Sequence, residues 1–387
     1  MMTSLQKGII NIIRSALTGK KFDLPDDFSL KDALDIAKKH QIINLFYYGA
    51  VNCGIDPNDP LMLGVFNTVC SNISRNERQT YEYNGISGAF EKNGIDYLPL
   101  KGLDIRKLYP KEDMRIMGDI DILIKESQYA GITSVMTGLG FKDLNESNHE
   151  HIWKNNGVIV ELHKRLIPSY NKDYYKYFGD GWQLAHPDGN GKHLFKMRDE
   201  NNYVYIFAHF AKHYRDGGIG LRHLVDLYVC RNHYKELDLE YIDKELEKLH
   251  LKEFYHNVSM TLDALFENAE ENDMTELITN YIFESGPYGT RMRQLISSRL
   301  KNANGRKAGE AMSIIFLPLE NMKLEYPVLK KMPFFLPVFW VARGFRTVFL
   351  RKGRIKKNVE KLSSVNDDDV KEYKEYLNYV GLGFYNK

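Results

Sequence analysis

The chain has 387 residues, which is more than one small domain requires and predicts two or three domains. Hydrophobic residues make up 43% and charged residues 27%, a composition typical of a globular protein with a sizeable core. The formal net charge of +2 argues against a strongly basic nucleic-acid-binding protein. The cysteines, Cys53, Cys70 and Cys230, are widely spaced without a CxxC pair, so neither a disulfide framework nor a zinc ribbon is expected and a cytoplasmic location is favoured.

Residues 1–93 are expected to form an N-terminal helical region. Apolar residues recur three and four positions apart through most of this stretch, and Gly94 is a typical residue to end its last helix. Residues 1–21 lack the uninterrupted apolar run of a signal peptide. No stretch of the chain approaches the roughly 18 consecutive apolar residues of a transmembrane helix, so none is expected.

The hydrophobic period changes after this region, and residues 94–199 are expected to form a mixed α/β core. Short strands are predicted within 95–100 and 116–124, and a helix is predicted after the second of them. Asn156 and Gly157 separate two apolar runs, which is a strong local signal for a tight β-hairpin. The fold class is therefore expected to be α+β, with a mixed sheet between two helical regions.

The helical period returns in the second half of the chain, where residues 200–387 are expected to form a C-terminal helical domain. Residues 171–199, just before it, are expected to be a long loop with a strand or two. Residues 330–357 mix apolar and basic side chains unusually densely. Such a segment can lie on an anionic bilayer, but a core helix with a solvated basic end is the preferred interpretation.

Two aspartates, Asp119 and Asp121, lie within the otherwise apolar run 116–124. Alternate residues of a strand point the same way, so both carboxylates would share one face. Neighbouring carboxylates repel and are costly to bury alone, so a positive group is expected between them. Glu161, on the second strand of the hairpin, would join them if its strand pairs beside theirs. Three carboxylates that hold a divalent cation suit phosphoryl or nucleotidyl transfer, with Mg²⁺ expected first and Mn²⁺ second.

A second set of candidates lies just upstream, where Lys101 and Gly102 follow the first strand and open a short helix. Glycine lets the backbone approach a phosphate closely, and a helix N-terminus presents free N–H groups to it. Arg115 adds another cation four residues before Asp119. These three residues are candidate contacts for a triphosphate.

The run LPLKGLDIRKLYPKEDMRIMGDIDILI, followed forty residues after Asp121 by VIVELH, resembles the nucleotidyltransferase family of the DNA polymerase β type. More narrowly, it resembles the bacterial branch described as uncharacterised nucleotidyltransferases, in which a Lys-Gly pair stands in place of Gly-Ser. The resemblance covers roughly residues 30–230.

This resemblance implies a mixed sheet with flanking helices, and transfer of a nucleoside monophosphate from NTP to an acceptor hydroxyl. Asp119 and Asp121 match the metal-binding pair, and Glu161 matches the third carboxylate, which helps to activate the acceptor. Lys101 and Gly102 match the triphosphate loop. The serine hydroxyl that usually contacts phosphate is absent from this sequence.

Further candidates lie beyond these motifs. His163 shares a strand face with Glu161 and is a candidate for lining the nucleotide site. Relatives often close the nucleotide cleft with the helical region that follows, so Lys212 and Arg222 are candidate phosphate contacts. Arg222 and Asp226 are also spaced for an intrahelical ion pair, which is the simpler interpretation.

The histidines allow a different interpretation of the same region. His149, His151 and His163 could form a zinc site across the hairpin, with the first two facing the same way, but no cysteine or HExxH helix supports it. His209 and His213 are four residues apart and are expected to be partly buried.

The leading hypothesis is thus a Mg²⁺-dependent nucleotidyltransferase that uses NTP. Its acceptor would be a small molecule, a protein or an envelope precursor, and nucleic acid is not favoured. The alternative is a nucleotide-binding or protein-interaction module that keeps the fold without turnover. The separation of Glu161 from the two aspartates discriminates between them. The expected location is the cytoplasm, with contact to the inner membrane surface through 330–357 as an option.

Overall fold

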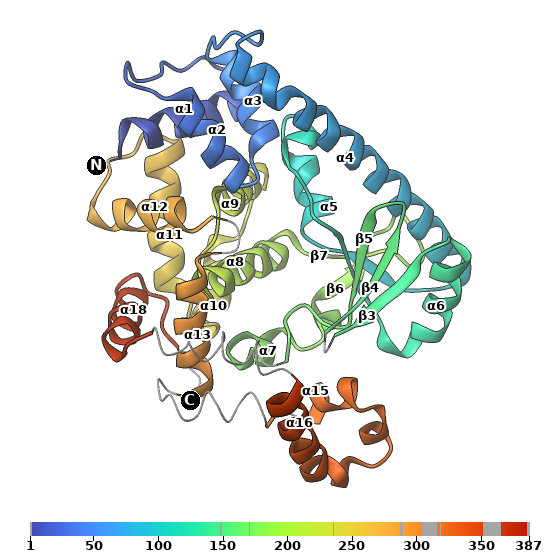
Figure 1. Ribbon diagram of the computed structural model, residues 1–387. Helices are drawn as coiled ribbons and strands as arrows, with labels where there is room; N and C mark the ends of the chain where they lie inside the picture. Colours follow the sequence, from blue (N-terminus) through green and yellow to red (C-terminus); the bar gives the residue numbers. More distant parts are fainter. Residues whose placement is uncertain are drawn as a thin grey trace.

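The computed structural model describes residues 2–147, 149–169, 171–234, 236–286, 289–303, 316–317, 319–350 and 365–384 (Figure 1). The helices are α1 (Ser4–Thr18), α2 (Leu30–Lys39), α3 (Ile43–Asn52), α4 (Pro60–Asn93), α5 (Gly102–Ile105), α6 (Tyr129–Gly138), α7 (Lys172–Phe178), α8 (Asp199–Arg215), α9 (Leu221–His233), α10 (Leu239–Lys248), α11 (Lys252–Phe266), α12 (Asp273–Ser285), α13 (Arg291–Ala303), α15 (Leu319–Glu325), α16 (Leu336–Leu350) and α18 (Asp367–Tyr379). The strands are β1 (Tyr97–Pro99), β2 (Ile120–Ile124), β3 (Lys142–Glu146), β4 (Glu150–Asn155), β5 (Val158–His163), β6 (Ala185–Pro187) and β7 (Phe195–Met197). The predicted α+β class is confirmed.

The long helix α4 has clear chemical signals at both ends. It begins at Pro60 directly after Asp59, whose side chain accepts a hydrogen bond from the Leu61 amide at 2.8 Å. It ends at Gly94, whose φ of 69° places it in the left-handed region that favours glycine. The predicted end of the helix at Gly94 is confirmed.

The main sheet has five strands in the order β1-β2-β5-β4-β3. β2 and β5 are parallel, and the other neighbours are antiparallel. The hairpin of β4 and β5 turns at Asn156 and Gly157, with φ of 46° and 80°, which confirms the predicted Asn-Gly turn. The edge strand β3 was not predicted, because its sequence KDLNE offers a single apolar side chain, Leu144, which is exposed.

One face of the sheet packs on α4 and α6. Ile120 and Ile122 of β2 and Val160 of β5 are fully buried there, in a cluster with Phe90 of α4 and Met136 of α6. Since side chains alternate along a strand, the residues between them face the opposite way. This second face of the sheet is turned toward the C-terminal helices (Figure 1).

The N-terminal and C-terminal helices share the larger hydrophobic core, in which α1 packs on both α3 and α11. The buried His40, at the end of α2, links the two regions. Its Nδ1 accepts a hydrogen bond from the Leu221 amide, and its Nε2 lies 3.1 Å from the Phe283 carbonyl oxygen. The proposed boundary at residue 94 follows the end of α4, and the one between residues 199 and 200 falls one residue inside α8, which begins at Asp199. The division into three regions stays a prediction.

Residues 171–199 contain more structure than expected. β6 and β7 form the predicted additional strands and pair antiparallel. The helix α7 was missed, because it has only seven residues and its periodicity is too short to recognise. It is stabilised by burial of Tyr174 and Phe178, which lie one turn apart and pack in the larger core.

The basic and apolar segment 330–357 lies within the described residues only as far as Leu350. In that part, Phe334 is 70% exposed, and Val338 and Val341 are each 59% exposed. No helix in the described parts of the chain is long and apolar enough to cross a membrane. Contact of this segment with a membrane surface stays a prediction.

Candidate functional site

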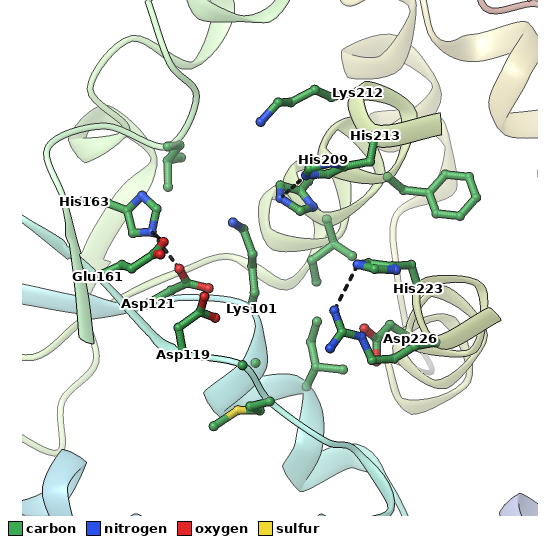
Figure 2. A pocket seen from close by; sticks show the side chains of 18 of the residues that line it. Lys101, Asp119, Asp121, Glu161, His163, His209, Lys212, His213, His223 and Asp226 are labelled. Atoms are coloured by element: carbon green, nitrogen blue, oxygen red, sulfur yellow. Dashed lines mark hydrogen bonds and ion pairs between the residues drawn. The ribbon is translucent and has the colours of Figure 1, made fainter. Parts of the chain in front are cut away.

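A cavity of about 300 Å³ lies between the second face of the sheet and helices α8 and α9. Carboxylates project into it from the sheet, and lysine and histidine side chains project from the helices (Figure 2). The cavity brings together all of the site residues proposed from the sequence, which are Lys101, Gly102, Arg115, Asp119, Asp121, Glu161, His163, Lys212 and Arg222.

Asp121 and Glu161 lie side by side because their strands are parallel neighbours. Asp121 of β2 is in register with Glu161 of β5, and Leu123 is in register with His163. One ligand atom each from Asp121, Glu161 and His163 lies within 4.8 Å of the other two. Asp119 directly precedes β2 and lines the same cavity, but it is outside this tighter group.

The loop that carries Asp119 is held from behind by α4. Arg75 donates a hydrogen bond from Nη2 to the Gly118 carbonyl oxygen at 2.6 Å. Gln79 donates from Nε2 to the Met117 carbonyl oxygen at 3.4 Å. These contacts fix the backbone of the two residues that precede Asp119, so the carboxylate is presented by a supported loop.

The three carboxylates differ in charge state. Burial, with repulsion from Asp119 and Asp121, raises the pKa of Glu161 to about 8. Burial and Asp121 also raise the pKa of Asp119. Burial opposes ionisation of Asp121 too, but Lys101 and the hydrogen bond from His163 hold the pKa of Asp121 below its ordinary value. A cation among these groups would favour the ionised form of all three carboxylates.

Lys101 reaches the carboxylates from a strained backbone position, with φ of 44° and ψ of −100°. Its ammonium lies 5.5 Å from the centre of the Tyr205 ring. Burial disfavours the charged form, but Tyr205 and Asp121 more than reverse this, so the pKa of Lys101 is raised and the side chain stays positive. The side chain extends between the carboxylates and α8 (Figure 2).

Gly102 lies where the chain passes close to the loop before β2. A Cβ at this position would lie 2.7 Å from Met117 Sδ and 3.0 Å from Arg115 Nη1, so a serine here would require these two side chains to shift. The next residue, Leu103, is buried in the cluster under the sheet. Because α5 has only four residues, the positive charge at this position comes from the Lys101 side chain rather than from the helix end.

Arg115 forms a buried, bidentate ion pair with Asp226 of α9. Its Nε and Nη2 donate to the two Asp226 carboxylate oxygens at 2.7 and 2.9 Å, and the Tyr109 hydroxyl donates to Oδ1 at 2.7 Å. Asp226 was expected to pair along its helix with Arg222, but the structure shows it bound to Arg115 and Tyr109. Arg222 donates instead to the Ile116 carbonyl oxygen at 3.2 Å.

The opposite wall of the cavity is formed by α8 and α9. Burial and repulsion from other cations lower the pKa of Lys212 to about 8. His209 and His213 are partly buried, as predicted, and their Nε2 atoms are 3.1 Å apart. Burial holds the pKa of both histidines, and of His223, well below the ordinary value, so all three are neutral. Lys212 and Arg222 are therefore the cations of this wall.

The open end of the hairpin adds two residues to the cavity, His149 and Glu150. His151 faces away from them and stacks on Tyr129 of α6, with ring centroids 3.6 Å apart. The three histidines of the proposed zinc site are therefore not brought together. Glu150 was overlooked in the sequence, although counting back from the Asn-Gly turn pairs it with His163, as observed.

The fold and the cavity together define a class of protein. A mixed sheet presents carboxylates from neighbouring parallel strands, and the facing helices supply cations, which suits a polyphosphate bound with a divalent metal. A family model described as uncharacterised nucleotidyltransferase matches residues 26–267, more than half of the chain. The chain belongs to this nucleotidyltransferase family. Comparisons with curated proteins and with solved structures gave no significant match. Both walls of the cavity lie within the matched residues.

Proposed function

We propose that this protein is a Mg²⁺-dependent nucleotidyltransferase that transfers a nucleoside monophosphate from NTP to an acceptor hydroxyl and releases pyrophosphate. The observation that carries the proposal is the register of Asp121 with Glu161 on parallel strands, which leaves their ligand atoms and that of His163 within 4.8 Å of one another. Membership of the nucleotidyltransferase family supports the same class of reaction. A wide separation of these carboxylates would instead have favoured a binding module without turnover.

The donor set fits a hard divalent cation. The carboxylate oxygens of Asp119, Asp121 and Glu161 are the ligand type that Mg²⁺ prefers, and Mn²⁺ is the second choice. His163 Nε2 lies 2.7 Å from Asp121 Oδ1 and orients that carboxylate, whose other oxygen remains for a metal. When bound, the cation would neutralise charge on the polyphosphate and make the acceptor hydroxyl more acidic.

Glu161 is the group proposed to receive the acceptor's proton. In the reaction, the hydroxyl oxygen attacks the α-phosphorus, the bond from that phosphorus to the bridging oxygen of the β-phosphate breaks, and pyrophosphate leaves with the electron pair. The Glu161 carboxylate accepts the hydroxyl proton. Without metal, burial and the two aspartates raise the pKa of Glu161 to about 8, and a bound cation would lower this pKa, so that the carboxylate is ionised and can accept a proton near neutral pH.

The triphosphate would be bound by Lys101, Lys212 and Arg222. Within the described residues, neither lysine has a carboxylate within 4.0 Å, so both ammonium groups can accept a new anionic partner. Lys101 extends toward the middle of the cavity, and Lys212 enters from the wall formed by α8 (Figure 2). Arg115, whose Nε and Nη2 are engaged by Asp226, positions the loop and adds its charge to the cavity.

The direct test uses the full-length chain with each of the four labelled NTPs, with Mg²⁺ or with EDTA. We expect nucleotide binding that requires the metal, and release of pyrophosphate. Glu161→Gln should keep nucleotide binding but lower turnover by roughly 10²- to 10⁴-fold, because the base is lost. Glu236→Gln, an exposed position, is the matched control.

Two outcomes would change the conclusion. Metal-dependent nucleotide binding without turnover of any NTP would identify a binding module on the same fold. If no NTP binds in the presence of Mg²⁺ or Mn²⁺, the proposed function is refuted.

A further inference from the structure

A second group of ligand atoms lies beside the carboxylates in the same cavity. It consists of His149, Glu150 and His163, with one ligand atom from each within 4.8 Å of the other two. We propose that these three residues bind a transition-metal ion, at a site separate from the Mg²⁺ position at Asp121 and Glu161. The proposal concerns metal binding alone and does not depend on the proposed reaction.

Both imidazoles approach the carboxylate of Glu150. Glu150 Oε2 lies 2.8 Å from His149 Nε2 and 4.0 Å from His163 Nδ1. Ligand atoms about 2.0–2.1 Å from a tetrahedral zinc ion lie about 3.3 Å from one another. The two observed separations bracket that value, so small side-chain rotations are enough to close the site around a metal.

The strongest evidence comes from one nitrogen of His163. Within the described residues, its buried Nδ1 has no hydrogen-bond partner. Its Nε2 lies 2.7 Å from Asp121 Oδ1, so this side of the ring is already engaged by the carboxylate site. On the other side, Nδ1 lies 4.0 Å from Glu150 Oε2, which is too far for a hydrogen bond. A metal ion between Nδ1 and Oε2 would give this buried nitrogen a partner.

The backbone holds these ligands in place before any metal binds. Glu150 and His163 are cross-strand partners in the hairpin. The Lys164 amide donates to the His149 carbonyl oxygen at 2.7 Å, which fixes His149 beside the end of the other strand. Ser147 Oγ lies 3.4 Å from His149 Nδ1 and can accept its proton when Nε2 binds a metal. Ser147 can therefore hold the His149 ring in place by a hydrogen bond from outside the metal site.

The ligand types indicate which metal would bind. Two imidazole nitrogens and one carboxylate oxygen favour Zn²⁺ or Co²⁺ over Mg²⁺. Three protein ligands leave one coordination position open, as in catalytic rather than structural zinc sites. Since all three residues line the cavity, an oxygen atom of a bound substrate, such as a hydroxyl or a phosphate, could occupy that position.

Co²⁺ is the probe for this site, because its visible absorption reports the ligands directly. Full-length protein is titrated with Co²⁺ in excess Mg²⁺, so that the carboxylate site is already filled. We expect one Co²⁺ per chain, with absorption typical of nitrogen ligands, and displacement by Zn²⁺. His149→Gln and Glu150→Gln should each weaken Co²⁺ binding by about 100-fold or more, because loss of outer partners alone costs about 10- to 100-fold.

Two further variants serve as controls, Asp119→Asn in the carboxylate site and His186→Gln at a surface histidine, and both should bind Co²⁺ within about twofold of the parent chain. Thermal unfolding checks the folding of every variant, and either ligand variant alone suffices if the other fails to fold. His149 and Glu150 retain 19% and 14% side-chain exposure, which favours tolerance of the substitutions.

Three results would overturn the proposal: no Co²⁺ binding in excess Mg²⁺, equal affinity in all variants, or loss of binding in Asp119→Asn but not in His149→Gln. The last result would place the metal at the aspartates. None of them affects the proposed nucleotidyl transfer, which uses neither His149 nor Glu150.

Discussion

The two walls of the cavity are built by different means. The sheet wall presents Asp121 and Glu161 from neighbouring strands, where the two-residue period decides which side chains share a face. The helical wall presents Lys212 and Arg222 from α8 and α9, whose placement depends on helix packing. Local geometry therefore defines the negative wall, whereas long-range packing defines the positive one.

The walls also respond to burial in opposite ways. On the sheet, burial and repulsion from Asp119 and Asp121 raise the pKa of Glu161 to about 8, whereas Lys101 and His163 hold the pKa of Asp121 below its ordinary value. On the helices, burial keeps His209, His213 and His223 neutral and leaves few cations. A polyphosphate with its metal ion complements both walls, because the metal ion can bind the carboxylates and the phosphates can bind Lys212 and Arg222.

Removal of charge from the sheet wall should have the largest effect. Asp121→Asn keeps the side-chain shape but should lower nucleotidyl transfer by on the order of 10³-fold or more, because a cation held here contributes several kcal/mol of charge stabilisation. Release of pyrophosphate measures the effect, with Asp143→Asn on the exposed edge strand as control. A loss of less than about tenfold would contradict the role given to Asp121.

The ion pair that joins the two walls should control stability. Asp226→Leu leaves Arg115 buried without its partner and should lower the free energy of unfolding by about 3–5 kcal/mol. Adding Arg115→Met to it should restore much of this loss, because no buried charge then remains unpaired. Urea unfolding provides the measurement, and equal losses in the single and double variants would argue against this account.

An ion pair on the outside of the helical region can be compared with the buried pair of Arg115 and Asp226. Arg231 and Asp263 form an ion pair at 2.8 Å in which the aspartate side chain is 45% exposed. Asp263→Asn should cost only about 1 kcal/mol or less, because solvent screens an exposed pair.

The helical wall is tested by Lys212→Met. We expect the Kd for NTP to rise by about tenfold, since a hydrogen bond to a charged group contributes roughly 1.5 kcal/mol. Calorimetric titration with nucleotide and Mg²⁺ measures this change, and Lys142→Met on the exposed edge strand is the control. An unchanged Kd would show that α8 does not contact the phosphates.

The smallest predicted effect is the pH dependence of stability that arises because metal binding displaces a proton. The pKa of Glu161 is about 8 in the folded chain against 4.5 ordinarily, so between these values the folded state binds a proton that the unfolded state lacks. Metal-free stability should therefore fall as pH rises through this window. Below pH 8, Mg²⁺ must displace this proton in order to bind. We therefore expect Mg²⁺ to raise Tm more at pH 8.5 than at pH 6. Glu161→Gln should remove this pH dependence, and a parent Tm shift that is equal at both pH values would contradict the linkage.

Much of the sheet wall could be predicted from the sequence. The Asn-Gly turn placed β4 and β5, and alternation placed Glu161 and His163 on one face. The same hairpin register pairs Glu150 with His163, so the place of Glu150 could also have been predicted from the sequence. Edge strand β3 and the short α7 were not, because KDLNE has one apolar residue and α7 spans too few residues for a periodic signal.

The helical wall shows where sequence reasoning ends. Arg222 and Asp226 have the spacing of an intrahelical pair, yet Asp226 binds Arg115, more than a hundred residues earlier in the chain. Tyr205, which lies against Lys101, carries no local signal that separates it from an ordinary core residue. Such contacts depend on which helix face packs on which loop.

The sequence by itself determined the alternating faces of β2 and β5, the hairpin turn and the end of α4 at Gly94, because each follows from covalent geometry within a few residues. Only the tertiary structure decided that β2 and β5 are parallel neighbours, that Arg115 pairs with Asp226, and that His163 Nδ1 has no hydrogen-bond partner among the described residues. These features depend on contacts between residues far apart in the chain, which local conformational preference does not specify.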